Sequence, residues 1–161
     1  MPKDITRMQL EFRAHWRYYV AQSIIAAAAI VIILTVLGLK HSFIVGSLGS
    51  STFTVFAMPK NVTARMRNVF GGHMIGLACG LAFSFMYSAA PSAEIPALGL
   101  AVGLTMFLMV VLDAEHPPAA GTTLGVVLAG RSWQVILTVI TSVLMLVLLH
   151  FLLKRWMHDL V

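Results

Sequence analysis

Long stretches without a charged side chain dominate this sequence. Residues 20–39, 69–88 and 133–153 contain no Asp, Glu, Lys or Arg, and each has the length of about 20 residues that an α-helix needs to cross a bilayer. Over the whole chain 59% of the residues are hydrophobic and 11% are charged, whereas a soluble domain has about 25% charged residues. The sequence therefore predicts an integral membrane protein.

Three more apolar segments are shorter than these. Residues 96–112 fall slightly short of a span, and residues 117–130 cover about two-thirds of one. Residues 42–58 are rich in Gly, Ser and Thr, which lower helix propensity. The fold class that we expect is all-α, with about six transmembrane segments of which the second and the fifth are short or broken.

Residues 1–19 differ from the rest because charged and aromatic side chains are interspersed with apolar ones. The segment lacks the apolar core of a cleaved signal peptide. Its apolar side chains recur at helical spacing, which predicts an amphipathic helix lying on the membrane surface. These residues are Ile5, Met8, Phe12, Trp16 and Tyr19.

The basic residues predict an orientation in the membrane. With six crossings, nine of the eleven Lys and Arg residues fall on the side of the N-terminus, and only Lys40 and Arg131 fall on the other. Because Lys and Arg are enriched in cytoplasmic loops, we expect a bacterial inner-membrane protein with both termini in the cytoplasm. Residues 89–95 are then an external loop and residues 154–161 a cytoplasmic tail. The nine are Lys3, Arg7, Arg13, Arg17, Lys60, Arg65, Arg67, Lys154 and Arg155.

The two short segments resemble each other. Residues 49–57 begin with Gly-Ser-Ser and end with Val-Phe-Ala, and residues 121–129 begin with Gly-Thr-Thr and end with Val-Leu-Ala. The chain then divides into two units of three helices, residues 20–88 and 96–153, and the odd number of helices makes the second unit inverted relative to the first. Inverted repeats with discontinuous helices recur in transporters. A match over nine positions in so biased a composition is also compatible with chance.

This repeat predicts a site for a small anion. We expect the first short helix to begin near Gly49 or Ser50 and the second to begin near Pro118, so that their N-termini face each other at the midplane. A helix N-terminus offers unpaired amide hydrogens and about half a positive charge, which suit an anion. Hydroxyl donors would come from Ser47, Ser50, Ser51, Thr122 and Thr123. The alternative is that these hydroxyls cap helices and allow close packing.

The run His116-Pro117-Pro118 is expected to break the chain between two helices. Proline cannot continue a helix that precedes it but suits the first turn of the next one, and it holds the residue before it in extended geometry. His116 would then lie at the break, where it could gate, bind the anion or carry a proton. The alternative is a histidine that hydrogen-bonds carbonyl groups at a helix end.

Other polar residues lie close to these segments in the sequence. His73 is placed one turn into the third helix, where an ionisable group is either functional or structural. Arg67 and Asn68 precede it, and Arg67 either collects anions or sets the topology. Asp113 and Glu115 flank the proline turn and would repel an anion at close range.

Three ordered motifs resemble the HPP family of integral membrane proteins. They are Glu-His-Pro-Pro-Ala-Ala-Gly-Thr-Thr at residues 115–123, Arg-Asn-Val-Phe-Gly-Gly-His at residues 67–73 and Gly-Ser-Leu-Gly-Ser-Ser at residues 46–51. The resemblance implies a small polytopic membrane protein, and plant and cyanobacterial members are described as nitrite transporters. Asp113 and Glu115 depart from the family pattern, in which neutral or hydroxyl residues are expected.

The function expected from these arguments is transport of a small anion, with nitrite first. The alternatives are a passive channel and a membrane assembly protein without a substrate. An intramembrane enzyme is not favoured, because the histidines and carboxylates lack a nucleophile or a metal-site spacing. Expected substrate-binding residues are Ser47, Gly49, Ser50, Ser51, His116, Pro117, Pro118, Gly121, Thr122 and Thr123, with His73, Asp113, Glu115, Arg67 and Asn68 gating or coupling protons.

The expected partners are the anion, membrane lipid and further copies of the chain. Six helices make a thin bundle, which favours a homo-oligomer. The net charge of +5 is explained by topology and lipid headgroups, so we expect no nucleic acid, and no motif indicates a cofactor or a metal. Two glycine series with a spacing of four permit close helix contact or an interface between copies. They are Gly72, Gly76 and Gly80, and Gly99 and Gly103.

Overall fold

The computed structural model describes residues 5–37 and 42–161, without the side chains of residues 5–9, 11, 37, 42 and 43. Lys3, Arg7 and Lys40 of the predicted charge distribution, and Ile5 and Met8 of the predicted surface helix, therefore lie outside the described side chains. The described ranges are helical and contain no strand. The elements are α1 (Ile5–Leu37), α2 (Ser42–Ala57), η1 (Val62–Ala64), α3 (Met66–Tyr87), η2 (Pro91–Ala93), α4 (Glu94–Val111), α5 (Ala119–Ala129), α6 (Trp133–Leu153) and η3 (Lys154–Trp156).

Four of the described helical segments are long and apolar enough to cross a membrane, and α2 and α5 are shorter. The prediction of an all-helical membrane protein is confirmed. The second and fifth segments are the short ones, as expected. Whether α2 and α5 cross the membrane as halves of an inverted repeat stays a prediction. The four long segments are Phe12–Val36, Met66–Tyr87, Pro91–Val111 and Trp133–Trp156.

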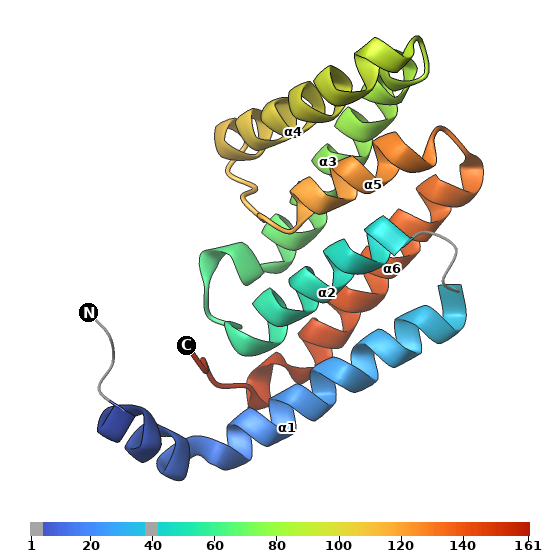
Figure 1. Ribbon diagram of the computed structural model, residues 1–161. Coiled ribbons are helices and arrows are strands. Elements are labelled where there is room, and N and C mark those ends of the chain that lie inside the picture. The colour runs from blue at the N-terminus through green and yellow to red at the C-terminus, as the bar shows by residue number, and fades with distance from the viewer. Residues whose placement is uncertain (1–4, 38–41) are drawn as a thin grey trace.

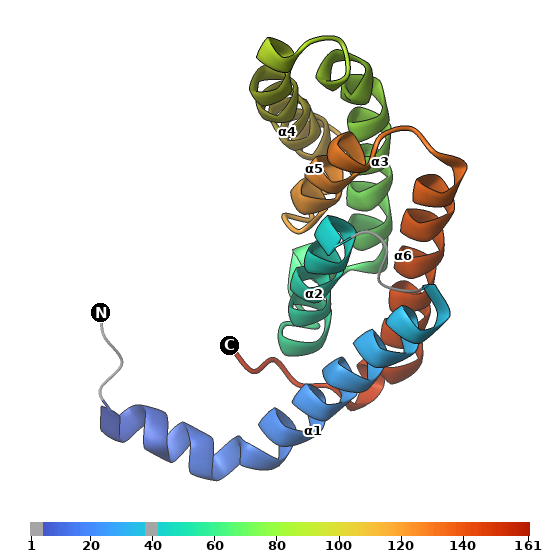
Figure 2. The same ribbon diagram turned by 45° about the vertical axis from the view of Figure 1, so that its right-hand side comes forward.

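Successive helices run in alternating directions, so that the start of α1 and the residues after α6 lie at the same end of the bundle (Figures 1 and 2). The loop with Lys60 and Arg65 and the start of α3 with Arg67 lie at this end, together with η3. Arg131, between α5 and α6, lies at the opposite end. The described basic residues therefore segregate as the topology prediction requires, whereas the assignment of this end to the cytoplasm stays a prediction.

Helix α3 packs closely against α5 through glycines. A Cβ atom added at Gly76 would lie 2.7 Å from the carbonyl oxygen of Ala119, and one added at Gly80 would lie 2.7 Å from Cβ of Val126. Real side chains do not approach so closely, so only glycine permits this helix spacing. Close contact is confirmed for this glycine series. Gly99 and Gly103 on α4 are exposed and have no atom within 4 Å of such a Cβ.

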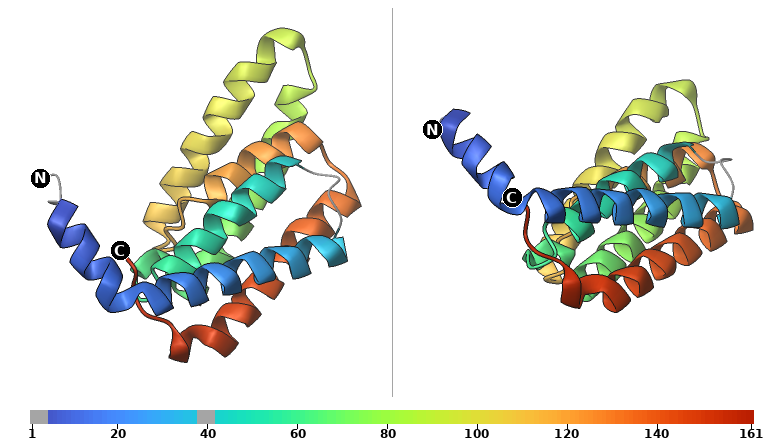
Figure 3. Two further views of the ribbon diagram at one scale, coloured as in Figure 1. Left: turned by 60° about the horizontal axis from the view of Figure 1, so that its bottom comes forward. Right: turned by 90° about the horizontal axis from the view of Figure 1, so that it is seen from below.

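Helix α1 is continuous through residue 19, the boundary expected between a surface helix and the first span. Its first part projects beyond the bundle (Figure 3). The position of this part on the membrane surface stays a prediction.

The second part of α1 is tied to the C-terminal residues by Gln22. The Gln22 amide donates to the carbonyl oxygens of Phe56 (2.5 Å) and His158 (2.9 Å), and its oxygen accepts from the amide of His158 (2.9 Å). The amide of Leu160 also donates to the carbonyl oxygen of Ala57 at 2.9 Å. The segment that follows α6 therefore closes the bundle between α1 and α2.

Candidate functional site

The start of α2 differs from the prediction. The helix begins at Ser42 and continues to Ala57, so Gly49 and Ser50 lie inside it, and both are exposed. Each glycine or serine lowers the stability of a helix by about 1 kcal/mol or less, and residues 42–57 contain no proline that would interrupt the helix. The hydroxyl of Thr52 donates to a carbonyl oxygen four residues earlier at 2.8 Å and so stays bonded inside the helix. The expectation of a helix N-terminus near Gly49 was therefore wrong.

The start of α5 agrees with the prediction, since the helix begins at Ala119 with Pro118 as its N-cap. Its first available amides are already paired. Ala119 donates to the carbonyl oxygen of His116 (2.9 Å), Ala120 to that of Pro117 (3.1 Å), and Gly121 to that of Pro118 (3.0 Å). These amides do not face an opposing helix N-terminus, so the expected pair of facing N-termini is not formed.

The middle of α2 instead contacts the start of α5. The hydroxyl of Ser47 donates to the carbonyl oxygen of Pro118 at 2.8 Å, and the Oγ atom of Ser47 also lies 2.6 Å from Oγ1 of Thr122. A Cβ atom added at Gly121 would lie 3.3 Å from Cβ of Ser47, so the glycine permits the close approach. Helices α2 and α5 therefore lie side by side and antiparallel (Figure 1).

His73 lies fully buried between these two helices. Its Nε2 atom is 2.9 Å from Oγ of Ser51 on α2, and its Nδ1 atom is 2.8 Å from Oγ1 of Thr122 on α5. Both ring nitrogens therefore lie within hydrogen-bond distance of a hydroxyl group, as is usual for buried polar groups.

His116 is also fully buried, and it shares Ser51 with His73. Its Nε2 atom lies 3.0 Å from Oγ of Ser51, and its Nδ1 atom lies 2.8 Å from the carbonyl oxygen of Thr63. The two imidazole centroids are 5.1 Å apart. Burial lowers the pKa of His116 from 6.5 to about 4, although the hydrogen bond to Thr63 opposes this shift.

The predicted charged residues lie at the end of the bundle and outside this buried group. Arg67 donates to the Asp113 carboxylate at 2.9 Å and to the carbonyl oxygen of Leu112 at 2.9 Å. The Arg67 and Asp113 side chains are 67% and 74% exposed, so the ion pair itself contributes about 1 kcal/mol or less. Asn68 donates to the carbonyl oxygen of Glu115 at 3.3 Å. Together these contacts tie the start of α3 to the segment before α5.

A family model described as "HPP, transmembrane region" matches residues 11–159 of this chain. The chain belongs to the HPP family. A transmembrane protein of Dictyostelium discoideum is 28% identical over 111 residues, which are 68% of this chain and 38% of that protein. The chain thus spans 38% of the length of this relative. No solved structure matches this chain.

The three residues of the HPP motif in this family member have different environments. His116 enters the buried group, Pro117 is exposed, and Pro118 supplies a carbonyl oxygen. Thr122 joins the group, whereas Thr123 contacts Thr105 on α4 at 2.9 Å. The structure therefore brings together part of the predicted set and leaves out the rest. The side chains that meet are those of Ser47, Ser51, His73, His116 and Thr122, and the backbone of Pro118 and Gly121 contacts Ser47.

Two partners were missed by the sequence analysis of this HPP protein. Thr63 contributes a backbone oxygen, for which its side chain gives no signal. Thr105 is a hydroxyl residue inside an otherwise apolar helix, and that contrast could have identified it. Among the described residues there is no group of three or more His, Cys, Asp or Glu placed to hold a metal ion.

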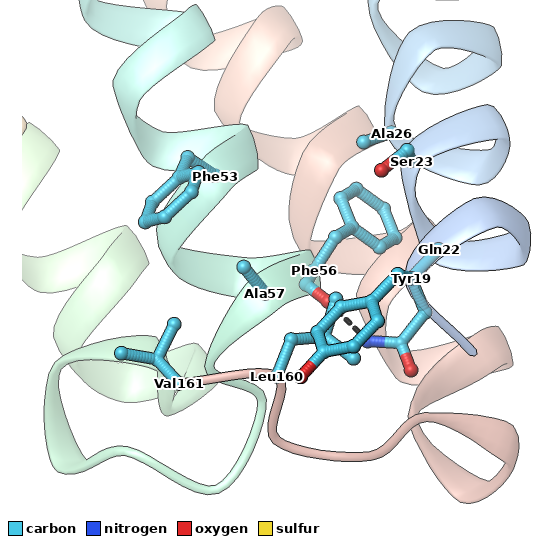
Figure 4. Close-up of a pocket in the computed structure, with 9 residues that line it drawn as sticks. All are labelled: Tyr19, Gln22, Ser23, Ala26, Phe53, Phe56, Ala57, Leu160 and Val161. Atoms are coloured by element: carbon cyan, nitrogen blue, oxygen red, sulfur yellow. Dashed lines mark hydrogen bonds between the residues drawn. The ribbon is translucent and has the colours of Figure 1, made fainter. Parts of the chain in front are cut away.

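A cavity of about 290 Å³ lies away from the histidines, between α1, α2 and the C-terminal residues. Figure 4 shows the aromatic rings of Tyr19, Phe53 and Phe56 around it, with the Gln22 hydrogen bond at one side. Its lining includes no member of the buried histidine group. The polar chemistry of this HPP protein and this apolar cavity are therefore separate features.

Proposed function

We propose that this HPP-family membrane protein transports a small anion, with nitrite as the first candidate. The observation that carries the proposal is the buried group of Ser, Thr and His side chains between α2, α3 and α5. Polar and ionisable side chains are costly inside a membrane protein and usually mark the path of a substrate or an ion. The surrounding helices are otherwise apolar, so this group is where a polar solute would be stabilised.

The charges around the group support an anion over a cation. The group contains hydroxyls and imidazoles and no carboxylate. Asp113 lies at the end of the bundle and is neutralised by Arg67. Arg65 is exposed at the same end and would raise the local concentration of anions. The resemblance to nitrite-transporting members of the family points to the same class of substrate.

The contacts within the group support a carrier over a permanently open channel. Each hydroxyl and imidazole already bonds to another member or to a carbonyl oxygen, so an anion must displace some of these contacts. The contact of α2 with α5, where Ser47 and Gly121 meet, borders the group on one side. Movement of α2 against α5 would expose the hydroxyls to one side of the membrane. A passive channel remains the second candidate.

We further propose a bacterial inner membrane, cytoplasmic termini and a homo-oligomer. The orientation is supported by the basic residues that share one end of the bundle. The oligomer is supported by the exposed apolar face of α4, which includes Leu100, Met106 and Phe107 as well as its two exposed glycines. In a single copy this face contacts only lipid.

Flux into proteoliposomes tests the function. Entry of nitrite, nitrate, formate and chloride is followed with internal dyes for the wild type, Ser51→Ala and Ser84→Ala. Ser84 is the matched control, because its buried hydroxyl bonds only within α3. We expect saturable nitrite entry that is lost in Ser51→Ala and kept in Ser84→Ala.

Other outcomes decide between the alternatives. Flux that rises linearly with concentration would favour a channel. No anion flux above that of empty vesicles, or equal nitrite flux in Ser51→Ala and the wild type, would contradict the proposal and leave an assembly role.

A further inference from the structure

The buried group forms one continuous chain of hydrogen-bond contacts, which we call the histidine chain. It runs from the carbonyl oxygen of Thr63 through five side chains to the carbonyl oxygen of Pro118. The six contact distances are 2.8, 3.0, 2.9, 2.8, 2.6 and 2.8 Å. In order, the side chains are His116, Ser51, His73, Thr122 and Ser47.

A neutral histidine chain lacks one hydrogen. Each of the three hydroxyls carries one hydrogen, and each neutral imidazole carries one, so five hydrogens are available. There are six contacts, and the carbonyl oxygens at both ends can only accept. One contact must therefore hold two lone pairs facing each other at 3.0 Å or less, which is repulsive.

One additional proton completes all six contacts. If it is placed on His73, that ring donates in both directions, and each following group donates toward its own end of the chain. If it is placed on His116, that ring donates to Thr63 and to Ser51, and Ser51 donates to His73. The two arrangements differ only in the hydrogens on either side of Ser51. A concerted shift through the Ser51 hydroxyl converts one into the other without breaking a contact.

We propose that the histidine chain binds one proton, shared between His73 and His116 through Ser51. A second proton does not fit. With both rings charged, both would donate to Ser51, whose own hydrogen would then have no acceptor. Two positive rings with centroids 5.1 Å apart would also repel each other. The expected stoichiometry is therefore one proton for two histidines.

The surroundings determine when the proton is held. The charged side chains on the segments that pack against the two rings are Arg65 and Arg67 before and in α3, and Asp113 and Glu115 before α5. Helices α2 and α5 and the η1 turn carry none. Burial opposes a charge here, as the lowered pKa of His116 indicates. The histidine chain therefore lacks the additional proton at rest near neutral pH. It takes up this proton transiently, whichever solute the protein moves.

The removal of Ser47 distinguishes this proton site from a purely structural cluster. Ser47 contacts neither imidazole, but it supplies one end of the chain. In Ser47→Ala the chain ends at Thr122, with four contacts and four hydrogens, so the neutral form is complete. An extra proton then completes no additional hydrogen bond. We expect it to bind about tenfold more weakly, which corresponds to the loss of one hydrogen bond.

The test is nitrogen NMR of histidine-labelled protein in lipid nanodiscs, titrated from about pH 7 to about pH 3, which is one unit below the lowered pKa of His116. Single His→Gln variants assign the signals of His73 and His116. For the wild type we expect both rings to change together and to take up one proton in total. Ser142→Ala, which removes a buried hydroxyl bonded only within α6, is expected to titrate like the wild type.

Thr122→Val provides a second variant in case Ser47→Ala does not fold. It divides the chain into two pieces, each with as many hydrogens as contacts, so it should weaken proton binding as Ser47→Ala does. The proposal is overturned if each ring takes up its own proton, or if neither ring is protonated in this range. Titration of both Ser47→Ala and Thr122→Val like the wild type would overturn it as well.

Discussion

Helices α2 and α5 contain similar triplets, Gly-Ser-Ser and Gly-Thr-Thr, but at different positions along the helix. In α2 the triplet lies in the middle of a 16-residue helix, whereas in α5 it begins at the third residue of an 11-residue helix. The difference comes from what precedes each triplet. Pro117 and Pro118 force a new start before α5, while the residues before Gly49 only lower helix propensity. Equal motifs therefore do not imply equal helix boundaries.

This difference creates the buried site. Because the two helices are antiparallel and offset, the middle of α2 faces the first turn of α5. Ser47 and Ser51 are four residues apart and lie on the same face of α2, while Gly49 and Ser50 are exposed. On α5 the face toward α2 and α3 belongs to Thr122. A symmetric pair of helix starts would have presented amides in place of hydroxyls.

The largest expected effect comes from a side chain placed against α5. Gly76→Leu puts Cβ about 2.7 Å from the carbonyl oxygen of Ala119, so α3 and α5 must separate. We expect loss of the folded protein. The matched change on α2 is Gly46→Leu, where a Cβ meets no atom within 4 Å. Yield and size-exclusion profiles in detergent measure both, and equal tolerance of the two changes would show that the α3–α5 contact is not required.

The next largest effect is expected from acid, because His116 lies just before α5. Burial holds the pKa of His116, just before α5, at about 4, against 6.5 in an unfolded chain. Between these values only the unfolded chain binds a proton at His116. Stability is therefore full above pH 6.5 and falls as the pH decreases toward 4, by up to about 3 kcal/mol. Thermal unfolding across this range measures the fall, and His116→Gln should flatten the curve. An unchanged curve in that variant would contradict the assignment.

A smaller effect is expected from one hydroxyl on each helix. Thr122→Val breaks the contacts with His73 and Ser47 and leaves buried polar atoms without partners, at a cost of about 2 kcal/mol. Thr52→Val on α2 removes a hydroxyl that bonds only to a carbonyl oxygen of its own helix, and should cost less. Melting temperatures of the two variants measure the difference, and a reversed order would place the important hydroxyl on α2.

The smallest effect should be a gain in stability. Gly49 lies mid-helix on α2 with no atom within 4 Å of an added Cβ, so Gly49→Ala should stabilise the protein by about 0.5–1 kcal/mol. Gly121→Ala on α5 would place Cβ 3.3 Å from Cβ of Ser47 and should lose this gain. The same melting experiment compares them. A destabilised Gly49→Ala would mean that this face of α2 is covered in the membrane.

Charge and proline were the reliable signals in the sequence. Uncharged stretches located the four long segments, although the one expected over residues 96–112 was judged slightly short and extends over Pro91–Val111. Pro117 with Pro118 located the start of α5. The start of α2 was not predictable in the same way. A run of Gly, Ser and Thr is compatible with a helix or with a break, and packing against α5 decides between them.

The members of the site were easier to predict than their arrangement. Buried Ser, Thr and His in apolar helices stand out by composition, so Ser51, His73 and Thr122 were found. The bond from His116 to the backbone of Thr63 depends on how η1 folds against the proline turn. Side-chain identity carries no information about such a backbone acceptor, so the end of the histidine chain at Thr63 could not be predicted from the sequence.

The bonds of Gln22 have a consequence for the order of assembly in the cell. This side chain is 3% exposed in the finished bundle and bonds to His158, which is 136 positions later in the chain. Until His158 has been synthesised, Gln22 can bond only to the carbonyl oxygen of Phe56, and its remaining polar groups bind water or lipid headgroups. The full set of Gln22 bonds therefore forms only after residue 158 has been synthesised, and we expect a truncation before His158 to weaken the packing of α1 on the bundle.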